Sequence, residues 1–413
     1  MRGQFPHFGY NPRNAMMKIA VALLLISLLQ AGATPDPVAA MVGRLDLAKY
    51  KATIKGLTQF GDRRQGTDRN RAAVDWIEAQ LKSYGCTNTE RIQYEYAGQQ
   101  VRPTPAPAGN RGASPSQVVI PTPQRSANGG RPRGVSVAVG VNTDPERQPD
   151  PKLRAINAQP DTPGPREEIY CTKIGTTHPE EMYIVGAHMD GIGYGEAAND
   201  DGSGTALVME LARIFSSPDV QTDRSIRFIL WNNEETGTQG SMAYVTQRQA
   251  LQGKESPAGS GIYPEPKWLG MIQHDMMLFD HGAPRADGTL SREQRPEADI
   301  NVEFNVGSMF AAESQTLAWE FQKANEKYAT DYPVTVGSHM TNTDSAPFQN
   351  IVPAISLREA ERGTQIGIGW DPQWHQPTDV FATYDDKDFR LGLNAAQTTL
   401  AAIAQLTGAR LTK

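Results

Sequence analysis

Cysteine is scarce in this 413-residue chain, which contains only Cys86 and Cys171. Two cysteines are too few for a disulfide-rich scaffold, and their arrangement does not fit a zinc site built from cysteine. The chain also lacks a dense run of lysine and arginine, and its formal net charge is −6, so we expect no nucleic-acid partner. The apolar run at residues 19–29 is far shorter than the roughly 20 residues that a membrane-spanning helix needs.

That apolar run has the features of a secretory signal peptide. Met16, Met17 and Lys18 precede it, and the small residues 31–33 follow it as a cleavage pattern. We therefore predict a signal peptide over residues 1–33, a secreted or periplasmic protein, and no membrane partner after cleavage. The polar stretch 2–15 is unusual before a signal peptide, and translation from Met16 or Met17 would remove it.

The predicted export affects whether the two cysteines form a disulfide. An oxidising compartment permits a disulfide, and Cys86 and Cys171 each lie beside a predicted strand. We expect a bond between them, and the alternative is a pair of separate buried thiols.

Hydrophobic periodicity predicts strands that alternate with helices. The predicted helices are residues 68–85, 204–215, 317–328 and a closing helix with an apolar stripe from Phe389 to Ile403. The predicted strands are residues 91–96, 168–174, 182–187, 226–231, 269–272 and 354–357. This order indicates an α/β fold with a mixed, mostly parallel central sheet and helices on both faces, in one domain over residues 45–410. A Pro/Gly-rich excursion at about 101–166 has too few large apolar residues for a core, and we assign it no fold.

Potential metal ligands follow the predicted strands at their carboxyl ends, where open α/β sheets bind their ligands. His188 and Asp190 follow the strand 182–187, and Asp275 follows the strand 269–272. Glu234 and Glu235 follow the strand 226–231, and the loop 198–204 adds Asp200 and Asp201 where a helix begins. A single acid here would more often be a helix cap. Together, so many acids on one edge would repel one another without a cation.

The chemistry of these residues suits a pair of zinc ions. Zinc binds imidazole nitrogen and carboxylate oxygen, and a two-metal hydrolase needs one bridging carboxylate and one acid left free as a base. Adjacent Glu234 and Glu235 fit that division, because neighbouring side chains point in different directions. Asp190 lies two residues from His188, and its carboxylate could accept the ring N–H of that histidine.

Five ordered motifs closely resemble peptidase family M28, the group that includes bacterial leucyl aminopeptidases. They are GAHMDG at 186–191, ANDDGSG at 198–204, WNNEETGTQGS at 231–241, QHDM at 273–276 and WHQPTD at 374–379. The resemblance runs from about Tyr50 to the C-terminus, apart from the excursion. It implies a zinc exopeptidase of the phosphorylase/hydrolase-like fold, with two zinc ions and a peptide substrate.

The resemblance also implies a role for each site residue. Asp200 bridges the two zinc ions, His188 and Asp275 complete one site, and Glu235 and His375 complete the other. Glu234 is the general base, Asp190 orients His188, and the peptide bond before Asp201 is cis. Where many relatives have Ser-Asp-His, this chain has Thr343-Asp344-Ser345, which puts the substrate preference in doubt.

Other readings remain open beside the aminopeptidase. A carboxypeptidase or dipeptidase of the same family and a one-zinc glutaminyl cyclase share the fold, and a non-catalytic binding domain is the alternative of a different class. Among the other histidines, we expect a structural role for His274 and surface positions for His178 and His281. His339 is a weaker candidate for lining the substrate pocket.

Overall fold

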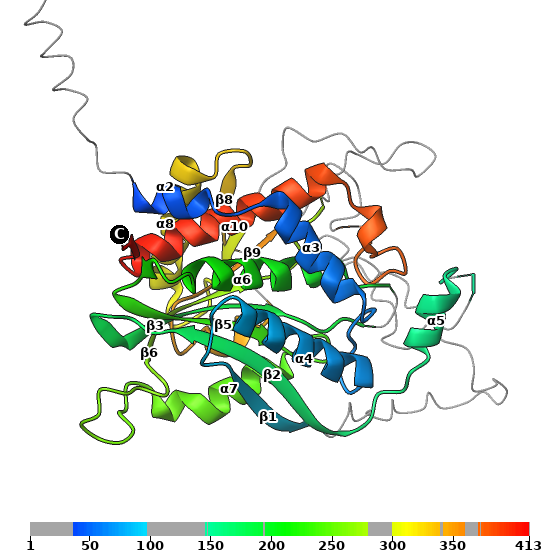
Figure 1. Ribbon diagram of the computed structural model, residues 1–413, viewed down its shortest axis with the longest axis horizontal. Helices are drawn as coiled ribbons and strands as arrows, with labels where there is room; N and C mark the ends of the chain where they lie inside the picture. Colours follow the sequence, from blue (N-terminus) through cyan, green and yellow to red (C-terminus); the bar gives the residue numbers. More distant parts are fainter. Residues whose placement is uncertain are drawn as a thin grey trace, which may run out of the picture.

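Figure 1 shows the computed structural model of the chain. The structure describes residues 36–96, 145–146, 148–192, 195–279, 300–338, 342–359, 371 and 373–412. The predicted signal peptide and residues 101–144 of the predicted excursion lie outside this part, as do His281 and His339. Within the described residues, none of the helices has both the length and the apolar content needed to cross a membrane.

A sheet of eight strands forms the centre of the fold, in the order β1-β2-β5-β3-β6-β9-β7-β8. Their bounds are β1 (Glu90–Tyr96), β2 (Gly164–Lys173), β5 (Arg224–Trp231), β3 (His178–His188), β6 (Lys267–His274), β9 (Ala354–Glu359), β7 (Ile300–Phe304) and β8 (Val334–Gly337). The four central strands β5, β3, β6 and β9 are parallel, while β2 and β7 run antiparallel to their inner neighbours. The predicted mixed sheet is confirmed. A separate pair joins β4 (Val220–Gln221) to β10 (Arg410–Leu411).

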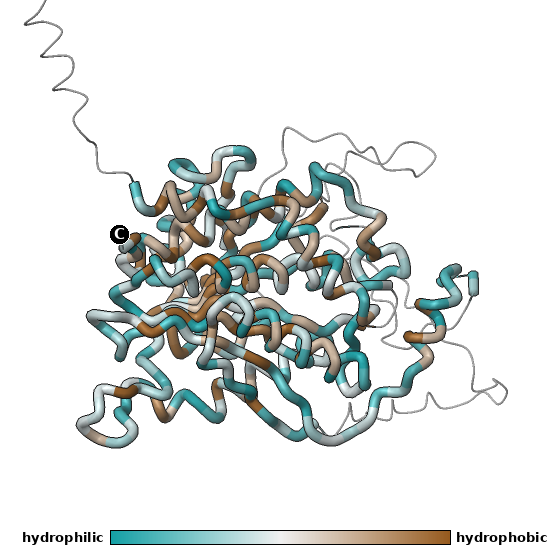
Figure 2. The backbone as a smooth tube through the Cα atoms, in the orientation of Figure 1, coloured by the Kyte–Doolittle hydropathy of each residue, from teal (hydrophilic) through white to brown (hydrophobic). Residues whose placement is uncertain are grey.

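Helices cover both faces of this sheet (Figure 1). The larger core lies under α3 (Leu47–Thr58), α4 (Asp68–Ser83), α6 (Gly202–Phe215), α8 (Ala311–Tyr328) and α10 (Asp386–Leu406). On the other face, a smaller and more aromatic core lies under α7 (Gln239–Arg248) and the short helix η2 (Ala346–Phe348). Figure 2 shows that the apolar segments concentrate in the central strands. The remaining helices are α2 (Pro37–Val42), α5 (Pro151–Asn157), η1 (Gln249–Leu251) and η3 (Phe381–Thr383).

Local sequence explains the elements that carry the site. Strands β3 and β5 end in runs of buried residues because both of their faces are covered. Helix α6 begins at its cap Asp201, whose carboxylate accepts the Gly204 N–H at 2.8 Å, and almost every residue of the helix is buried. The loop before α6 is therefore held between its own helix and the ends of the parallel strands.

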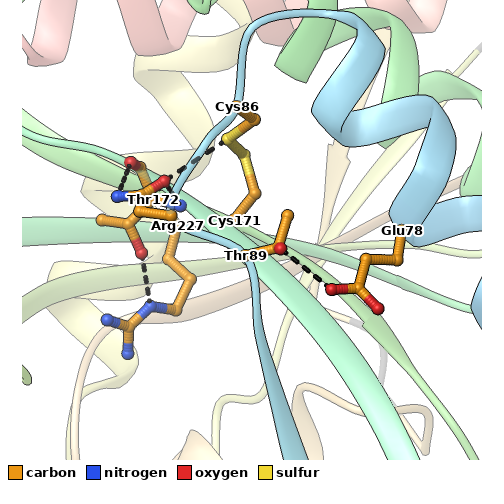
Figure 3. Close-up of a disulfide and its surroundings, with 7 residues drawn as sticks. Glu78, Cys86, Thr89, Cys171, Thr172 and Arg227 are labelled. Atoms are coloured by element: carbon orange, nitrogen blue, oxygen red, sulfur yellow. Dashed lines mark hydrogen bonds between the residues drawn. A yellow bond between two sulfur atoms is a disulfide. The ribbon is translucent and has the colours of Figure 1, made fainter.

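Figure 3 shows the disulfide of the chain and its surroundings. Cys86, just after α4, is bonded to Cys171 on β2, with their Cα atoms 6.1 Å apart. The expected bond is thus present, and it ties the segment between α4 and β1 to the sheet. Close by, Thr89 donates a hydrogen bond to Glu78 and Arg227 donates one to Thr172.

Several elements were not expected from the sequence. The strands β7 and β8 extend the sheet by two positions beyond β9, and α7 follows the two site glutamates. Within the predicted excursion, residues 151–157 form α5 and β2 begins at Gly164. The end of the excursion therefore leads directly into the sheet.

Candidate metal centre

The five predicted metal ligands come together at the carboxyl end of the parallel strands. His188 is the last residue of β3, Asp275 follows β6, and Glu235 lies in the loop after β5. Asp200 lies in the loop before α6, and His375 lies in the loop before η3. Their donor atoms form two groups, His188 with Asp200 and Asp275, and Asp200 with Glu235 and His375, each with all its atoms within 4.8 Å of one another. Asp200 belongs to both groups.

The two oxygen atoms of Asp200 face different histidines. Its Oδ1 lies 3.3 Å from Nε2 of His188, and its Oδ2 lies 3.0 Å from Nε2 of His375. Asp275 Oδ1 lies 3.7 Å from the His188 ring, and Glu235 Oε2 lies 3.0 Å from the His375 ring. One carboxylate therefore connects two sets of donors, as a bridging ligand must.

The charge balance of this centre favours cations. Burial alone would lower the pKa of the His188 ring, but Asp200 and Asp275 outweigh it and raise that pKa well above its ordinary value. Burial raises the pKa of Glu235 to about 7, and its Oε1 is buried without a hydrogen-bond partner. Imidazole nitrogens and carboxylate oxygens are the donors that zinc takes. The residues present therefore fit a pair of zinc ions.

Glu234 stands beside these groups without belonging to either. After β5 the chain turns at Asn233, whose φ of 65° is in the left-handed region that asparagine tolerates. This turn lets Glu234 and Glu235 diverge, and only Glu235 joins a donor group. Burial raises the pKa of Glu234 well above its ordinary value. Glu234 is thus an acid that remains available next to the predicted ligands.

Asp190 contacts His188 differently from the expected arrangement. The Nδ1 atom of His188 lies 3.0 Å from the main-chain oxygen of Asp190, whereas the Asp190 carboxylate is 3.9 Å away. That carboxylate instead accepts the Glu234 N–H at 3.1 Å. The main chain therefore orients the imidazole, and the Asp190 side chain holds the segment that carries the two glutamates.

Asp201 shows how tightly the loop is built. The peptide bond between Asp200 and Asp201 is cis, as the family resemblance implied. Besides capping α6, the Asp201 carboxylate accepts the N–H groups of His188 at 3.1 Å and of Met276 at 3.2 Å. It links the ends of β3 and β6 to the loop that carries Asp200.

Arg63 is a buried residue near the site that the sequence did not single out. Its guanidinium donates to the carbonyl oxygens of Met189 and Ala197 at 2.7 and 2.8 Å, and of Glu196 at 2.9 Å. It joins the segment after His188 to the segment before Asp200. An arginine in the loop before α4 carries no sequence signal for such a role.

The nearby histidine His274 is structural, as expected. It is fully buried, with Nδ1 3.1 Å from the Gly186 oxygen and Nε2 2.9 Å from the Thr399 hydroxyl. Burial lowers its pKa to about 4, so the ring is neutral at pH 7. His274 therefore connects β6 to β3 and α10 and faces away from the metal centre. His178 is half-exposed, as expected for a surface residue.

A small cavity opens onto the metal centre. Three of the predicted ligands, Asp200, Glu235 and His375, line it. Asp62, Ile192 and Ala197 are among the other residues that line it. A bound molecule in this cavity would touch the second donor group directly.

Paired imidazole and carboxylate groups at the ends of parallel strands define a metal-dependent hydrolase of the α/β class. The sequence pattern described as "Peptidase family M28" matches residues 169–399, more than half of the chain. The chain belongs to peptidase family M28.

Individual proteins agree with this assignment. The "Probable lipoprotein aminopeptidase LpqL" of Mycobacterium tuberculosis is 35% identical over 270 residues, which are 63% of this chain and 50% of that relative. The chain thus spans about half the length of this curated relative. Among solved structures, an aminopeptidase from Aneurinibacillus sp. strain AM-1 has a TM-score of 0.55 at 20% identity, covering 90% of this chain and 96% of that one. A glutaminyl cyclase from Porphyromonas gingivalis has a TM-score of 0.53 at 17% identity, covering 88% and 99%. At these identities the solved structures show the fold alone.

Proposed function

We propose that this protein is an exported metallo-exopeptidase, an aminopeptidase that holds two zinc ions and removes residues from the N-terminus of peptides. The observation that carries the proposal is the division of the Asp200 carboxylate between two donor groups, each completed by a histidine and a second acid. A one-zinc enzyme would need only one such group.

The proposed ligands are His188 and Asp275 for one ion, Glu235 and His375 for the other, and Asp200 for both. When bound, the ions would supply Lewis acidity, which lowers the pKa of a water molecule and polarises the scissile carbonyl. The chain contributes the rigid frame of strands β3, β5 and β6, from which the ligands project.

Glu234 is the proposed general base. It lies next to a ligand but outside both donor groups, so its carboxylate is free to accept a proton from water and return it to the leaving amine. Burial, which raises the pKa of Glu234, brings it closer to the range in which one group can take up and release a proton. Asp190 supports this role by accepting the Glu234 N–H.

Two features support activity outside the cytoplasm. The sequence predicts a signal peptide over residues 1–33, and the disulfide between Cys86 and Cys171 requires an oxidising compartment to persist. Cell fractionation followed by N-terminal sequencing of the recovered protein tests this part. Recovery of the unprocessed chain from the cytoplasm would contradict export.

Metal analysis combined with end-blocked peptides tests the activity. We expect about two zinc ions per chain, hydrolysis of peptides with a free N-terminus, and no hydrolysis when that terminus is acetylated. Hydrolysis that instead requires a free C-terminus would indicate a carboxypeptidase. One zinc ion per chain, together with cyclisation of N-terminal glutamine, would indicate a glutaminyl cyclase. A protein that binds no zinc and hydrolyses no peptide would indicate a binding domain.

A substitution at Glu234 tests the proposed base directly. Glu234→Gln keeps the size of the side chain but removes its basicity, so we expect retained zinc and a kcat lowered roughly 10²- to 10⁴-fold. Glu320→Gln, on the exposed side of α8 with Lys323 Nζ 2.7 Å from its carboxylate, is the matched control and should leave kcat unchanged. Near-normal turnover of the Glu234 variant would reject this residue as the base.

A further inference from the structure

Two loops that carry predicted ligands are bonded to each other beside the metal centre. One is residues 195–200, which end at Asp200, and the other is residues 375–381, which begin at His375. The Glu196 N–H donates to the Asp379 main-chain oxygen at 2.8 Å, and the Phe381 N–H donates to the Glu196 carboxylate at 2.8 Å. The loops therefore form one unit although they lie far apart in the sequence.

Gly195 shows how closely the two loops approach. A Cβ atom at this position would lie 2.6 Å from the Asp379 main-chain oxygen and 3.1 Å from that of Gln376. Both neighbours are backbone atoms of a turn, which cannot move aside as a flexible side chain would. Any side chain larger than hydrogen at Gly195 would therefore push the loops apart.

The carboxylate of Asp379 makes the most direct contact between the loops. It is buried, its Oδ1 accepts the Asn199 N–H at 2.8 Å, and its Oδ2 accepts the Asp200 N–H at 3.1 Å. Each oxygen thus holds one of two consecutive peptide groups, the second of which belongs to the proposed bridging ligand. The Tyr384 hydroxyl also donates to Oδ1, at 3.1 Å.

Asp379 is also connected to the donor group that contains His375. The Asp379 N–H donates to the Gln376 oxygen at 3.0 Å, within the turn that directly follows His375. The backbone of Asp379 is therefore set by the His375 turn, while its side chain sets the backbone of Asp200. Asp379 therefore links the backbone positions of these two predicted ligands directly.

We propose that Asp379 is a positioning residue for the metal centre, which fixes the direction of the Asp200 carboxylate relative to His375 and so determines how tightly zinc is held between them. The proposal rests on the proposed function, because it assigns Asp379 to the same pair of metal positions. Asp379 acts through two peptide groups and is not itself a ligand or a catalytic residue.

Zinc affinity of the full-length protein, measured by competition with a chelator, tests the proposal. In Asp379→Asn the side chain keeps its size but offers one acceptor oxygen, so one of the two peptide N–H groups loses its partner. We expect the zinc affinity to fall about 10- to 100-fold, with kcat largely restored at saturating zinc. Asp379→Glu keeps two acceptor oxygens and should recover part of the affinity.

Tyr384→Phe is the matched control. It removes the hydroxyl that donates to Asp379 and to Asp371 but leaves both peptide contacts in place. If Asp379 only stabilised this region of the fold, both substitutions would lower the melting temperature and neither would change zinc affinity selectively. We expect Tyr384→Phe to keep its zinc affinity within about threefold of the wild type.

Gly195→Ala provides an independent variant in case Asp379→Asn does not fold. It changes no charge, and we expect weaker zinc binding with unchanged circular dichroism. Wild-type zinc affinity in a folded Asp379→Asn or Gly195→Ala protein overturns the positioning role and leaves the proposed function standing. A wild-type protein that binds no zinc overturns both.

Discussion

Two buried clusters of charged side chains differ in whether the chain itself satisfies them. Under α7, the carboxylate of Glu265 accepts hydrogen bonds from Arg227, from Tyr244 at 2.7 Å, and from Trp268. The Arg227 guanidinium also donates to Thr172 and lies 4.1 Å from the centroid of the Tyr170 ring. Both charges are almost completely buried, and their polar atoms have partners.

At the metal centre, by contrast, buried acids outnumber their partners. Among the described residues, Glu235 Oε1, Asp190 Oδ2, Asp344 Oδ1 and both oxygens of Glu168 are buried without a hydrogen bond. Burying a charge without a partner raises the free energy of the folded state, and a partner charge or a bound metal ion offsets this penalty. The two clusters therefore differ in one respect: the chain itself satisfies the charges under α7, whereas acids around the predicted ligands keep oxygen atoms without a partner among the described residues.

The largest expected effect comes from removing the acid that both donor groups share. Asp200→Asn keeps the shape of the side chain but weakens both proposed metal positions, so we expect hydrolysis to fall by about 10³-fold or more. Zinc content should fall as well, measured by mass spectrometry of the dialysed protein. Full zinc content with normal turnover would show that the unpaired acids have another purpose.

Disrupting the paired cluster under α7 should lower the stability of the fold but leave the activity unchanged, unlike Asp200→Asn. Arg227→Met leaves Glu265 buried without its cation, and we expect the free energy of unfolding to fall by about 3–5 kcal/mol. Activity per folded molecule should be unchanged, because the cluster lies under α7 rather than at the metal centre. Denaturant unfolding and active-site titration measure the two quantities separately.

The double variant Arg227→Met with Glu265→Leu is the control for that prediction. Removing both charges should recover much of the lost stability, because no unpaired charge remains. If the double variant is as unstable as the single one, the cluster stabilises the fold mainly through its shape.

The acids at the metal centre should make the metal-free protein less stable as the pH rises. Burial raises the pKa of Asp344 from 3.8 to about 7 and that of Asp371 from 3.8 to about 6. Between about pH 4 and pH 7 the folded protein therefore holds protons that the unfolded protein has lost, and the free energy of unfolding falls with increasing pH. We expect a loss on the order of 2 kcal/mol across this window, seen by thermal unfolding in a chelator.

Added zinc and a neutral substitution should both reduce the pH dependence of the free energy of unfolding. Added zinc stabilises the ionised carboxylates, and Asp344→Asn removes one group that titrates. At pH 8 the metal-free Asp344→Asn protein should be more stable than the metal-free wild type, while at pH 5 the two should be similar. A wild-type protein whose stability rises with pH across the window would contradict the comparison.

The sequence predicted the central strands of the sheet better than the strands at its edge. Strands β3, β5, β6 and β9 lie where short apolar runs placed them, because a strand covered on both faces must be apolar along its length. Three of the predicted ligands, His188, Glu235 and Asp275, come together because parallel strands bring the residues that follow them to one edge, whereas Asp200 and His375 reach this edge on loops. Strands β7 and β8 have only five and four residues, too few for their pattern to distinguish them from a loop.

Features of the site that depend on the main chain could not be predicted. The expected partner of the His188 ring was the Asp190 carboxylate, but the main-chain oxygen of Asp190 lies closer. The contacts of Arg63 and Asp379 are likewise made to peptide groups. A residue that binds peptide groups can face any local sequence, so neither residue type nor spacing indicates its partner. Such contacts become visible only when the loops are placed in space.

The smallest expected effect lies at the surface and has the opposite pH dependence. Glu78 on α4 accepts hydrogen bonds from Arg91 on β1 at 2.8 Å and from Thr89 at 3.0 Å, and Lys82 lies 2.8 Å from it. The charges of Lys82 and Arg91 lower the pKa of Glu78 from 4.5 to about 2. Its contribution to stability is therefore complete above about pH 4.5 and is lost as the pH falls towards 2.

Glu78→Gln should thus lower the free energy of unfolding by about 0.5–1 kcal/mol at pH 7. The effect is small because exposure to solvent weakens ion pairs of this kind. The difference from the wild type should shrink on acidification towards pH 3, measured by denaturant unfolding with zinc present throughout. Asp68→Asn, which removes the exposed pair with Arg71 on the same helix, is the control and should have a smaller effect. A difference that grew on acidification would mean that Glu78 behaves like the unpaired acids of the metal centre, and the distinction between paired and unpaired charges would then fail.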